Sequence, residues 1–380
     1  MKSLQSLASF FLIVGLVYYS FFSLMPQKGS PSSVENTKFS TERALIPLKE
    51  ITKAPHYIGT KEHARVRNYL IGQLEELGLE TQIQEGFVIN PKWKSLDKPK
   101  NIIAKIQGSE NGKSLLLLSH YDSALTPSYG ASDAGSGVVT ILETLRAYKA
   151  SGKKPKNDII VLFTDAEEVG LDGARLFVNN HPWAKNVGIA LNFEARGSGG
   201  PSNMIVETNS GNKNLINAFM EADVKFPVAS SLMYSIYKML PNDTDSTVLR
   251  QGGDIDGFFF AFIDDHYDYH TANDTYDNLD VNTLQHQGEY LLPLVHYFGD
   301  SDLNQLKSLD DHVYINLPFF KIVSYPFTWV FPMLLVAIVL FIGLIIYGLR
   351  KRVLTGNGIV RGFIPFTLAM IFCGILGFYG

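Results

Sequence analysis

The chain has 380 residues, 46% of them hydrophobic and 18% charged, and a formal net charge of -4. This length and apolar content supply one large domain together with membrane segments, whereas the charge excludes the basic surface that nucleic-acid binding requires. The single cysteine, Cys373, lies in an apolar run, which excludes disulfides within the chain and thiolate zinc sites. Any metal must therefore be held by His, Asp and Glu side chains.

The chain opens with an apolar run over residues 7–25. This run is long enough to cross a bilayer, and before Pro26 it lacks the Ala-x-Ala sequence that is typical of a cleaved signal peptide. We therefore predict an uncleaved transmembrane anchor over residues 1–25. The next stretch is rich in Ser, Pro, Gly and Lys, which predicts a flexible tether over residues 26–45.

An amphipathic helix is predicted over residues 60–78, because Thr60 is a good amino-terminal cap and Gly78 a good terminator. Between them, apolar side chains recur at helical spacing: Val66, Leu70, Leu74 and Leu77. His63 lies off this apolar stripe, so we expect it to be solvated. Strands are predicted around residues 80–89 and 101–106.

The central feature of the sequence is a run of four leucines, residues 115–118, that leads to His120 and Asp122. Four leucines in succession predict a strand in the middle of a sheet, so both polar side chains emerge at its carboxyl end and on the same side. Asp133 follows in a loop of small residues just before a predicted helix amino terminus. This arrangement predicts half of a metal site.

Two further apolar strands also end in acids. Residues 159–163 lead to Glu167 and Glu168, and residues 187–193 lead to Glu194. Adjacent side chains cannot point the same way, so one glutamate of the pair can bind a metal while the other faces the substrate as a general base. Two surface glutamates at a helix start would be the ordinary interpretation, but the wholly apolar strand before them favours a site.

The last candidate ligand is His270, in a loop of hydroxyl and carboxylate neighbours that can orient its imidazole. His266 is the alternative imidazole in the same loop. Arg196 and Asp245 are candidates for lining a substrate cleft, and structural salt bridging is an equally good interpretation of either.

Strands alternate with helices through the middle of the chain, from residue 46 to a closing helix over residues 281–298. This alternation predicts an α/β fold with a mixed, largely parallel central sheet flanked by helices, in one domain over residues 46–300.

Five short motifs occur in order along this domain: His120-x-Asp122, Ser132-Asp133-x-Gly135-x-Gly137, Glu167-Glu168-x-Gly170, Asn192-x-Glu194 and Tyr269-His270-Thr271-x-x-Asp274-Thr275. Together they resemble the co-catalytic zinc aminopeptidases and glutamate carboxypeptidases over roughly residues 48–298. Within that group, the anchored amino terminus and the later apolar runs are most similar to the membrane-anchored branch of vacuolar membrane protease and endoplasmic-reticulum metallopeptidase.

The resemblance implies a zinc exopeptidase fold, two Zn²⁺ ions per chain and peptide substrates, with an aminopeptidase as the expected activity. It implies that His120, Asp133 and Glu194 hold one zinc and that Asp133, Glu168 and His270 hold the other, with a bridging water. Glu167 would be the general base, and Asp122 would hydrogen-bond the far nitrogen of His120 and so fix its tautomer.

After the domain we predict a connector over residues 301–326, hairpin-like around 313–323, and a membrane span over residues 327–349. A cytoplasmic loop over 350–361 begins with Arg350-Lys351-Arg352, and a second span is predicted over 362–380. These cations, and Lys2 at the start, place the domain on the extracytoplasmic side, in a periplasm or in a vacuolar or endoplasmic-reticulum lumen.

The resemblance to multi-span proteases leaves open that the chain is part of a longer protein. Two Asn-x-Thr sequences, at Asn242 and Asn273, would be glycan acceptors in a eukaryotic lumen.

Two alternatives come from other classes. A glutaminyl-cyclase-like acyltransferase has a related fold with one zinc, and the presence of both His120 and Glu194 argues against it. A non-catalytic receptor-type ectodomain is disfavoured because all five expected ligands are present.

Overall fold

The structure is a computed structural model that describes residues 2–92 and 94–379. Met1 and Gly380, the outer ends of the predicted anchor and of the predicted last span, lie outside the described residues, as does the side chain of Lys2. The chain divides into two compact units, Met1–Tyr325 and Pro326–Gly380, and each is described by itself.

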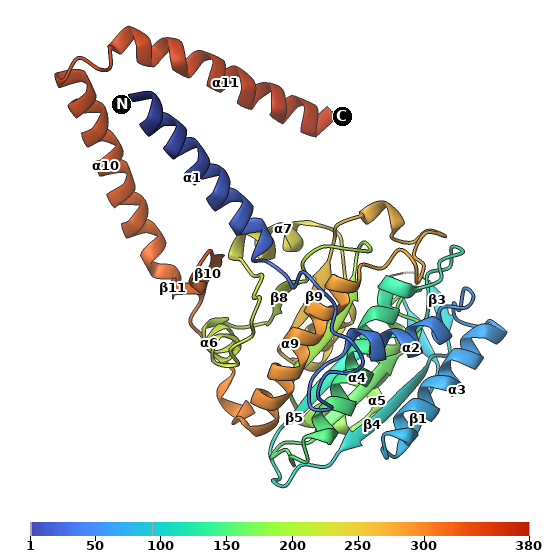
Figure 1. The fold of residues 1–380 in the computed structure, drawn as a ribbon. Helices are drawn as coiled ribbons and strands as arrows, with labels where there is room; N and C mark the ends of the chain where they lie inside the picture. The colour runs from blue at the N-terminus through green and yellow to red at the C-terminus, as the bar shows by residue number, and fades with distance from the viewer. Residues whose placement is uncertain (1, 93, 380) are drawn as a thin grey trace. The chain divides into compact units, whose positions relative to one another are not determined.

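A seven-stranded sheet forms the centre of the first unit, in the order β1-β4-β6-β5-β7-β9-β8 (Figure 1). The strands are β1 (Thr81–Glu85), β4 (Lys100–Ile106), β5 (Ser114–His120), β6 (Ile159–Thr164), β7 (Val187–Ala195), β8 (Asn203–Glu207) and β9 (Gly257–Phe262). The middle strands β6, β5, β7 and β9 run parallel, and the outer ones pair antiparallel. The predicted mixed, largely parallel α/β sheet is confirmed.

The leucines of β5 explain why the sheet is apolar on both faces. Leu115 and Leu117 belong to a core cluster that includes side chains of α4 (Gly137–Ala150) and α9 (Val281–Asp300). Leu116 and Leu118 belong to a second cluster on the other face, with side chains of α5 (Asp172–Asn180) and α8 (Asp245–Gly253). Because successive strand residues alternate between faces, a strand covered by helices on both sides has to be apolar throughout.

Further helices and two small strand pairs complete the domain of this unit. The helices are α2 (Thr41–Ile51), α3 (Lys61–Glu76), α6 (Lys213–Glu221) and α7 (Ser231–Met239). Two strand pairs lie outside the main sheet: β2 (Val88–Asn90) with β3 (Ser95–Asp97), and β10 (His312–Leu317) with β11 (Lys321–Pro326). The second pair confirms the hairpin predicted around residues 313–323.

Helix α3 forms as predicted, capped by the Thr60 side chain, but the expectation of a solvated His63 was wrong. His63 is buried, its Nε2 lies 2.9 Å from the Asp165 carboxylate, and its ring stacks on Tyr121 with 4.9 Å between centroids. The apolar stripe did not predict this because Asp165 follows β6, about a hundred residues further along the chain.

The segment expected to be a flexible tether over residues 26–45 differs from that expectation, since helix α2 begins at Thr41 and the residues before it are hydrogen-bonded to the domain. Ser30 donates to the side chain of Gln285 in α9. Two arginines, Arg43 and Arg146, donate to main-chain carbonyls of Ser32, Val34, Asn36 and Lys38. The composition of this stretch correctly indicates a polar segment. It cannot indicate an ordered one, because two of the hydrogen-bond partners, Arg146 and Gln285, lie far away in the sequence, in α4 and α9.

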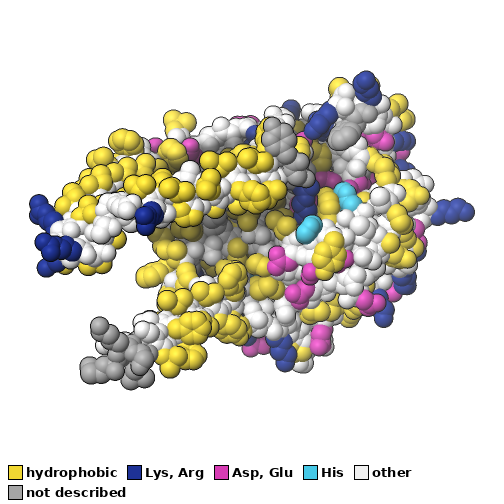
Figure 2. Space-filling model, turned by 90° about the horizontal axis from the view of Figure 1, so that it is seen from above, with side chains coloured by type: hydrophobic (Ala, Val, Ile, Leu, Met, Phe, Trp, Pro, Cys, Tyr) yellow, Lys and Arg dark blue, Asp and Glu magenta, His cyan; other side chains and the backbone are white. Residues whose placement is uncertain are grey.

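Three described helical segments are long and apolar enough to cross a membrane: Gln5–Phe22, Phe327–Arg350 and Gly356–Phe378. They correspond to α1 (Lys2–Phe22) in the first unit and to α10 (Val330–Arg350) and α11 (Gly356–Tyr379) in the second. In Figure 2, hydrophobic side chains cover these helices, as expected for surfaces that face lipid. The positions overlap the three predicted spans.

Candidate metal centre

Three neighbouring parallel strands bring the candidate residues to one edge of the sheet. His120 is the last residue of β5 and pairs with Thr164 at the end of β6, and Glu194 lies near the end of β7. Glu167 and Glu168 lie in the turn that follows β6, after Asp165 and Ala166. Carboxyl ends of parallel strands meet at the same edge, so these residues lie close in space although far apart in sequence.

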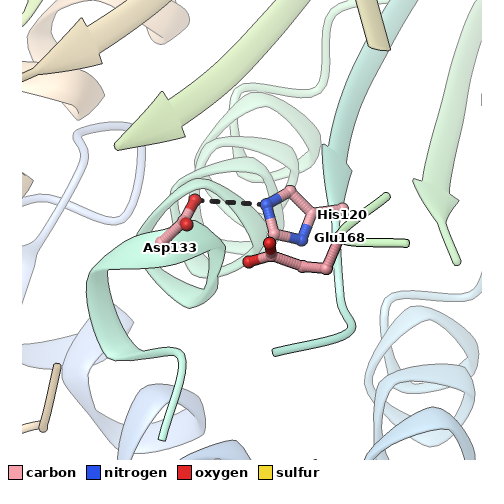
Figure 3. A group of neighbouring side chains, drawn as sticks. All are labelled: His120, Asp133 and Glu168. Atoms are coloured by element: carbon pink, nitrogen blue, oxygen red, sulfur yellow. Dashed lines mark hydrogen bonds and ion pairs between the residues drawn. The ribbon is translucent and has the colours of Figure 1, made fainter. Parts of the chain in front are cut away.

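The first cluster forms around the imidazole of His120. Its Nε2 lies 3.2 Å from Asp133 Oδ1 and 3.6 Å from Glu194 Oε2, and all three residues are buried. Asn192 fixes the glutamate by donating from Nδ2 to Oε1 at 2.9 Å. Figure 3 shows Asp133 and Glu168 next to the His120 ring, with a dashed line between Asp133 and the ring.

The second cluster forms around the imidazole of His270. Its Nε2 lies 3.1 Å from Asp133 Oδ2 and 3.0 Å from Glu168 Oε2. The two oxygens of Asp133 therefore face different imidazoles, and this one carboxylate joins the clusters. Ligand atoms of His120, Asp133 and Glu168 all lie within 4.8 Å of one another. The structure thus brings together the five side chains that the sequence motifs single out.

Asp122 forms the expected hydrogen bond with His120, but through its main chain and not through its carboxylate. The His120 Nδ1–H donates to the main-chain carbonyl of Asp122 at 2.9 Å, and the Asp122 carboxylate is 3.6 Å from that nitrogen. The carboxylate instead accepts the backbone N–H groups of Glu167 and Glu168, at 3.2 and 3.3 Å. Asp122 therefore leaves Nε2 of His120 free to bind a metal and also holds the loop that carries both glutamates.

The loop of Asp133 is held by Asp274, a motif residue to which the sequence interpretation gave no individual role. Asp274 accepts the backbone N–H groups of Ser132, at 2.6 Å, and of Asp133, at 3.3 Å. Asp274 belongs to the motif that includes His270, so the motif itself was the available signal. One carboxylate therefore ties the loop of the shared ligand to the loop of the distant histidine.

Glycine allows helix α4 to pack close behind this loop. A Cβ at Gly137 would lie 2.7 Å from the main-chain oxygen of Phe193 in β7 and would also clash with the Ser119 hydroxyl. The start of α4, four residues after Asp133, is consequently pressed against β5 and β7. This close contact keeps the loop of Asp133, whose carboxylate both clusters share, near the sheet.

The clusters concentrate negative charge in a buried volume. Burial raises the pKa of Glu168 to about 8, and the nearby charge of Asp133 adds to the rise. Burial also raises the pKa of Glu167 well above its usual range, against the opposing effect of His120. For His270, burial acts to lower the pKa, but hydrogen bonds with Asp133 and Glu168 outweigh it and raise the pKa to about 10. A bound cation would relieve this repulsion between carboxylates.

The donor set fits zinc. It consists of imidazole nitrogens and carboxylate oxygens without sulfur, and Zn²⁺ accepts both types of ligand. Oε1 of Glu168 is buried and has no hydrogen-bond partner among the described residues. An unpaired buried carboxylate oxygen costs free energy unless a cation or a water meets it.

A pocket of about 450 Å³ opens beside the clusters, with Asp133, Glu167 and Glu194 in its wall. The rest of the wall is largely apolar and comes from β8, α7 and β9, through side chains that include Ile205, Met233, Ile236, Tyr237, Leu240 and Phe259. This size and lining are typical of small-molecule sites.

Three other residues considered from the sequence have separate positions. Arg196 is exposed and lines the pocket, and Asp245 is buried and accepts a hydrogen bond from Thr164. Neither forms a salt bridge with any described residue. His266 is exposed and lines the pocket but lies outside both clusters.

Solved structures share this fold at low sequence identity. A leucine aminopeptidase precursor from Bacteroides thetaiotaomicron superposes with a TM-score of 0.55 at 24% identity, over 69% of this chain and 99% of that one. A Porphyromonas gingivalis glutaminyl cyclase gives a TM-score of 0.56 at 21% identity, over 68% and 98%. These likenesses establish the fold alone.

The fold and the two joined clusters define the class of protein, a metallopeptidase built on the zinc-exopeptidase fold. The sequence model of Peptidase family M28 matches residues 101–295, and the chain belongs to this family. The family resemblance noted from the five motifs is thereby confirmed.

Relatives of known name include membrane proteases. The chain is 31% identical over 258 residues to endoplasmic reticulum metallopeptidase 1 of Rattus norvegicus, which covers 65% of this chain and 28% of that protein. It is 30% identical over 270 residues to vacuolar membrane protease of Candida dubliniensis, covering 68% and 28%. The chain therefore spans less than a third of the length of these relatives.

Proposed function

We propose that this chain is a membrane-anchored exopeptidase that hydrolyses peptide bonds with two zinc ions and removes residues from the amino terminus of peptides. The observation that supports a dinuclear site is the position of Asp133. Its Oδ1 faces His120 and its Oδ2 faces His270, each at hydrogen-bond distance. A carboxylate placed between two imidazoles in this way is suited to bridging two ions.

In this proposal, His120, Asp133 and Glu194 hold one zinc, and Asp133, Glu168 and His270 hold the other. When bound, the two ions lower the pKa of a water so that hydroxide is available near neutral pH, and they polarise the peptide carbonyl.

Glu167 is the proposed general base. Its side chain lies in the pocket wall, whereas the neighbouring Glu168 points to His270. The two adjacent glutamates therefore face different ways, one toward the pocket and one toward the second cluster. From the pocket wall, Glu167 can accept the proton of the attacking water and pass it to the leaving amine. Asp122 holds its backbone in place.

Amino-terminal preference is proposed from the charges of the pocket. Carboxylates of Glu167, Glu194 and Asp243 line it, and a free peptide ammonium is the substrate group that such oxygens attract. Acetylation of the amino terminus removes this charge.

The proposed location is the extracytoplasmic side of a membrane. The span that ends at Arg350 is followed at once by Lys351 and Arg352, and such clusters favour the cytoplasmic side. The domain that precedes this span would then face a periplasm, a vacuole or the endoplasmic-reticulum lumen, with peptides and the bilayer as its partners.

Zinc content and peptide cleavage test the proposal together. The purified full chain is expected to hold two zinc ions, to cleave free peptides and to lose this activity when the peptide is acetylated. Glu167→Gln should keep both ions and lose about 100- to 10,000-fold in kcat, as is usual for removal of a general base. Normal turnover by that variant would refute the base assignment, and efficient cleavage of acetylated peptides would refute the amino-terminal preference.

Glutaminyl-cyclase chemistry is the second candidate, because solved glutaminyl cyclases share this fold. One zinc per chain, together with cyclisation of a peptide that begins with glutamine, would favour it. Failure of the zinc-loaded chain to act on any peptide would favour a receptor-type ectodomain.

A further inference from the structure

One permanent positive charge, the guanidinium of Arg196, lines the pocket beside the clusters. Asp133, Glu167, Glu194 and Asp243 are the acids of the same lining, and Arg196 is the only Lys or Arg among the described residues that form it. A lone cation in a wall of carboxylates is either paired with one of them or available to a ligand.

Arg196 is not paired. No carboxylate of a described residue lies within 4.0 Å of its guanidinium, although four acids line the same pocket. Its contact is with an aromatic face, since the guanidinium carbon lies 5.3 Å from the ring centroid of Tyr269. Tyr269 in turn stacks on His270 with 3.7 Å between centroids, so the guanidinium is one ring away from the second cluster. The contact steadies the side chain and leaves its N–H groups free.

The backbone holds Arg196 at the end of the strand that carries Glu194. Strand β7 ends at Ala195, and the Arg196 N–H continues its pairing by donating to the Phe262 carbonyl of β9 at 2.8 Å. Glu194 and Arg196 are two residues apart at the end of β7, and both line the pocket. Two residues of a strand span about 7 Å, which sets the approximate scale of their separation. An extended dipeptide has roughly the same length.

We infer that Arg196 binds a carboxylate of the substrate, so that this site takes short peptides with an anionic group about one residue beyond the scissile bond. The inference rests on the proposed function. A planar guanidinium matches a carboxylate with two parallel hydrogen bonds. The carboxylate is either the carboxyl terminus of a dipeptide or an acidic side chain that follows the scissile bond, and the apolar wall formed by Met233 and Ile236 accommodates a hydrophobic side chain.

The test compares three substrates of the purified, zinc-loaded full chain: Leu-Ala with a free carboxylate, its amide Leu-Ala-NH2, and Leu-Glu-NH2. The wild type is expected to prefer Leu-Ala over Leu-Ala-NH2 by about tenfold or more in kcat/KM, mostly through KM, because a hydrogen bond to a charged group contributes at least this factor. Cleavage of Leu-Glu-NH2 as efficient as that of Leu-Ala identifies an acidic side chain as a source of the carboxylate.

Variants of Arg196 test whether this residue is responsible for the preference for Leu-Ala over Leu-Ala-NH2. Arg196→Ala should bring the ratio of Leu-Ala to Leu-Ala-NH2 close to one, and Arg196→Lys should keep part of it because the charge remains. Lys154→Ala removes an exposed cation from the turn after α4 and serves as the matched control, with the wild-type ratio. If Arg196→Ala does not fold, Arg196→Gln keeps most of the stem and is measured in its place.

Two outcomes overturn the inference. The first is a wild type that cleaves Leu-Ala and Leu-Ala-NH2 equally well, and the second is an Arg196 variant that loses activity on both substrates but keeps the ratio. These are distinct from failure of the proposed function, which would appear as no cleavage of any of the three peptides by wild-type protein holding two zinc ions.

Discussion

Replacement of Asp122 by asparagine is expected to lower activity strongly while both metals stay bound. The two carboxylate oxygens accept separate backbone N–H groups, from Glu167 at 3.2 Å and from Glu168 at 3.3 Å. Asparagine has one acceptor oxygen, so its NH₂ group would face the second N–H in a buried site. Loss of one charge-assisted hydrogen bond and burial of an unpaired donor cost about 2–4 kcal/mol.

That free energy corresponds to about a 30- to 1,000-fold loss of kcat/KM if the loop of Glu167 and Glu168 is displaced in the transition state. The measurements are kcat/KM on a free peptide, zinc per chain and the unfolding temperature, for the wild type and Asp122→Asn. Asp277→Asn, which neutralises an exposed aspartate, is the matched control. Activity of Asp122→Asn within about threefold of wild type would refute the role assigned to these two hydrogen bonds.

Three further predictions concern metal content, packing and pH. His270→Ala should reduce zinc from two ions per chain to one, whereas Asp133→Ala should weaken both, and equal stoichiometry in the two variants would count against a shared carboxylate. Gly137→Ala should cost about 1–3 kcal/mol of stability through its clash with Phe193, while the control Gly72→Ala, where the new Cβ has no atom within 4 Å, should be neutral or stabilising in thermal unfolding. Burial lowers the pKa of His286 to about 4, so below about pH 6.5 the unfolded chain binds a proton that the folded chain excludes. The stability advantage of wild type over His286→Gln should therefore shrink by about 1.5 kcal/mol between pH 6.5 and pH 5 in urea denaturation, and an unchanged difference would contradict a buried neutral imidazole.

The convergence of the five candidate ligands could be predicted because it follows from local rules. The three strands are mostly apolar, parallel strands end at the same edge, and the polar residues lie at or shortly after the ends of the strands. His270 is the exception, since no local pattern ties it to β5, and its assignment came from the order of the motifs.

Other features could not be predicted because their partners are remote in sequence. His63 lies off the apolar stripe of its helix, yet the tip of β6 places Asp165 against it. The Asp122 carboxylate is two residues from His120, but the N–H groups that it accepts belong to a loop about 45 residues later. The cleft role of Arg196 was left open beside salt bridging, and only the spatial arrangement shows that no carboxylate of a described residue pairs with it.

The hydrogen-bonded segment that precedes helix α2 limits how far the domain can move from its anchor. Helix α1 ends at Phe22, and from Ser30 onward the chain is already fastened to the domain by Gln285 and Arg43. Only residues 23–29 are left to act as a spacer, and even fully extended they reach no more than about 25 Å. With α1 embedded in a bilayer, the point at which the chain joins the domain would stay within about 25 Å of the end of that helix. The proposed peptidase would therefore be confined to peptides that come near the membrane.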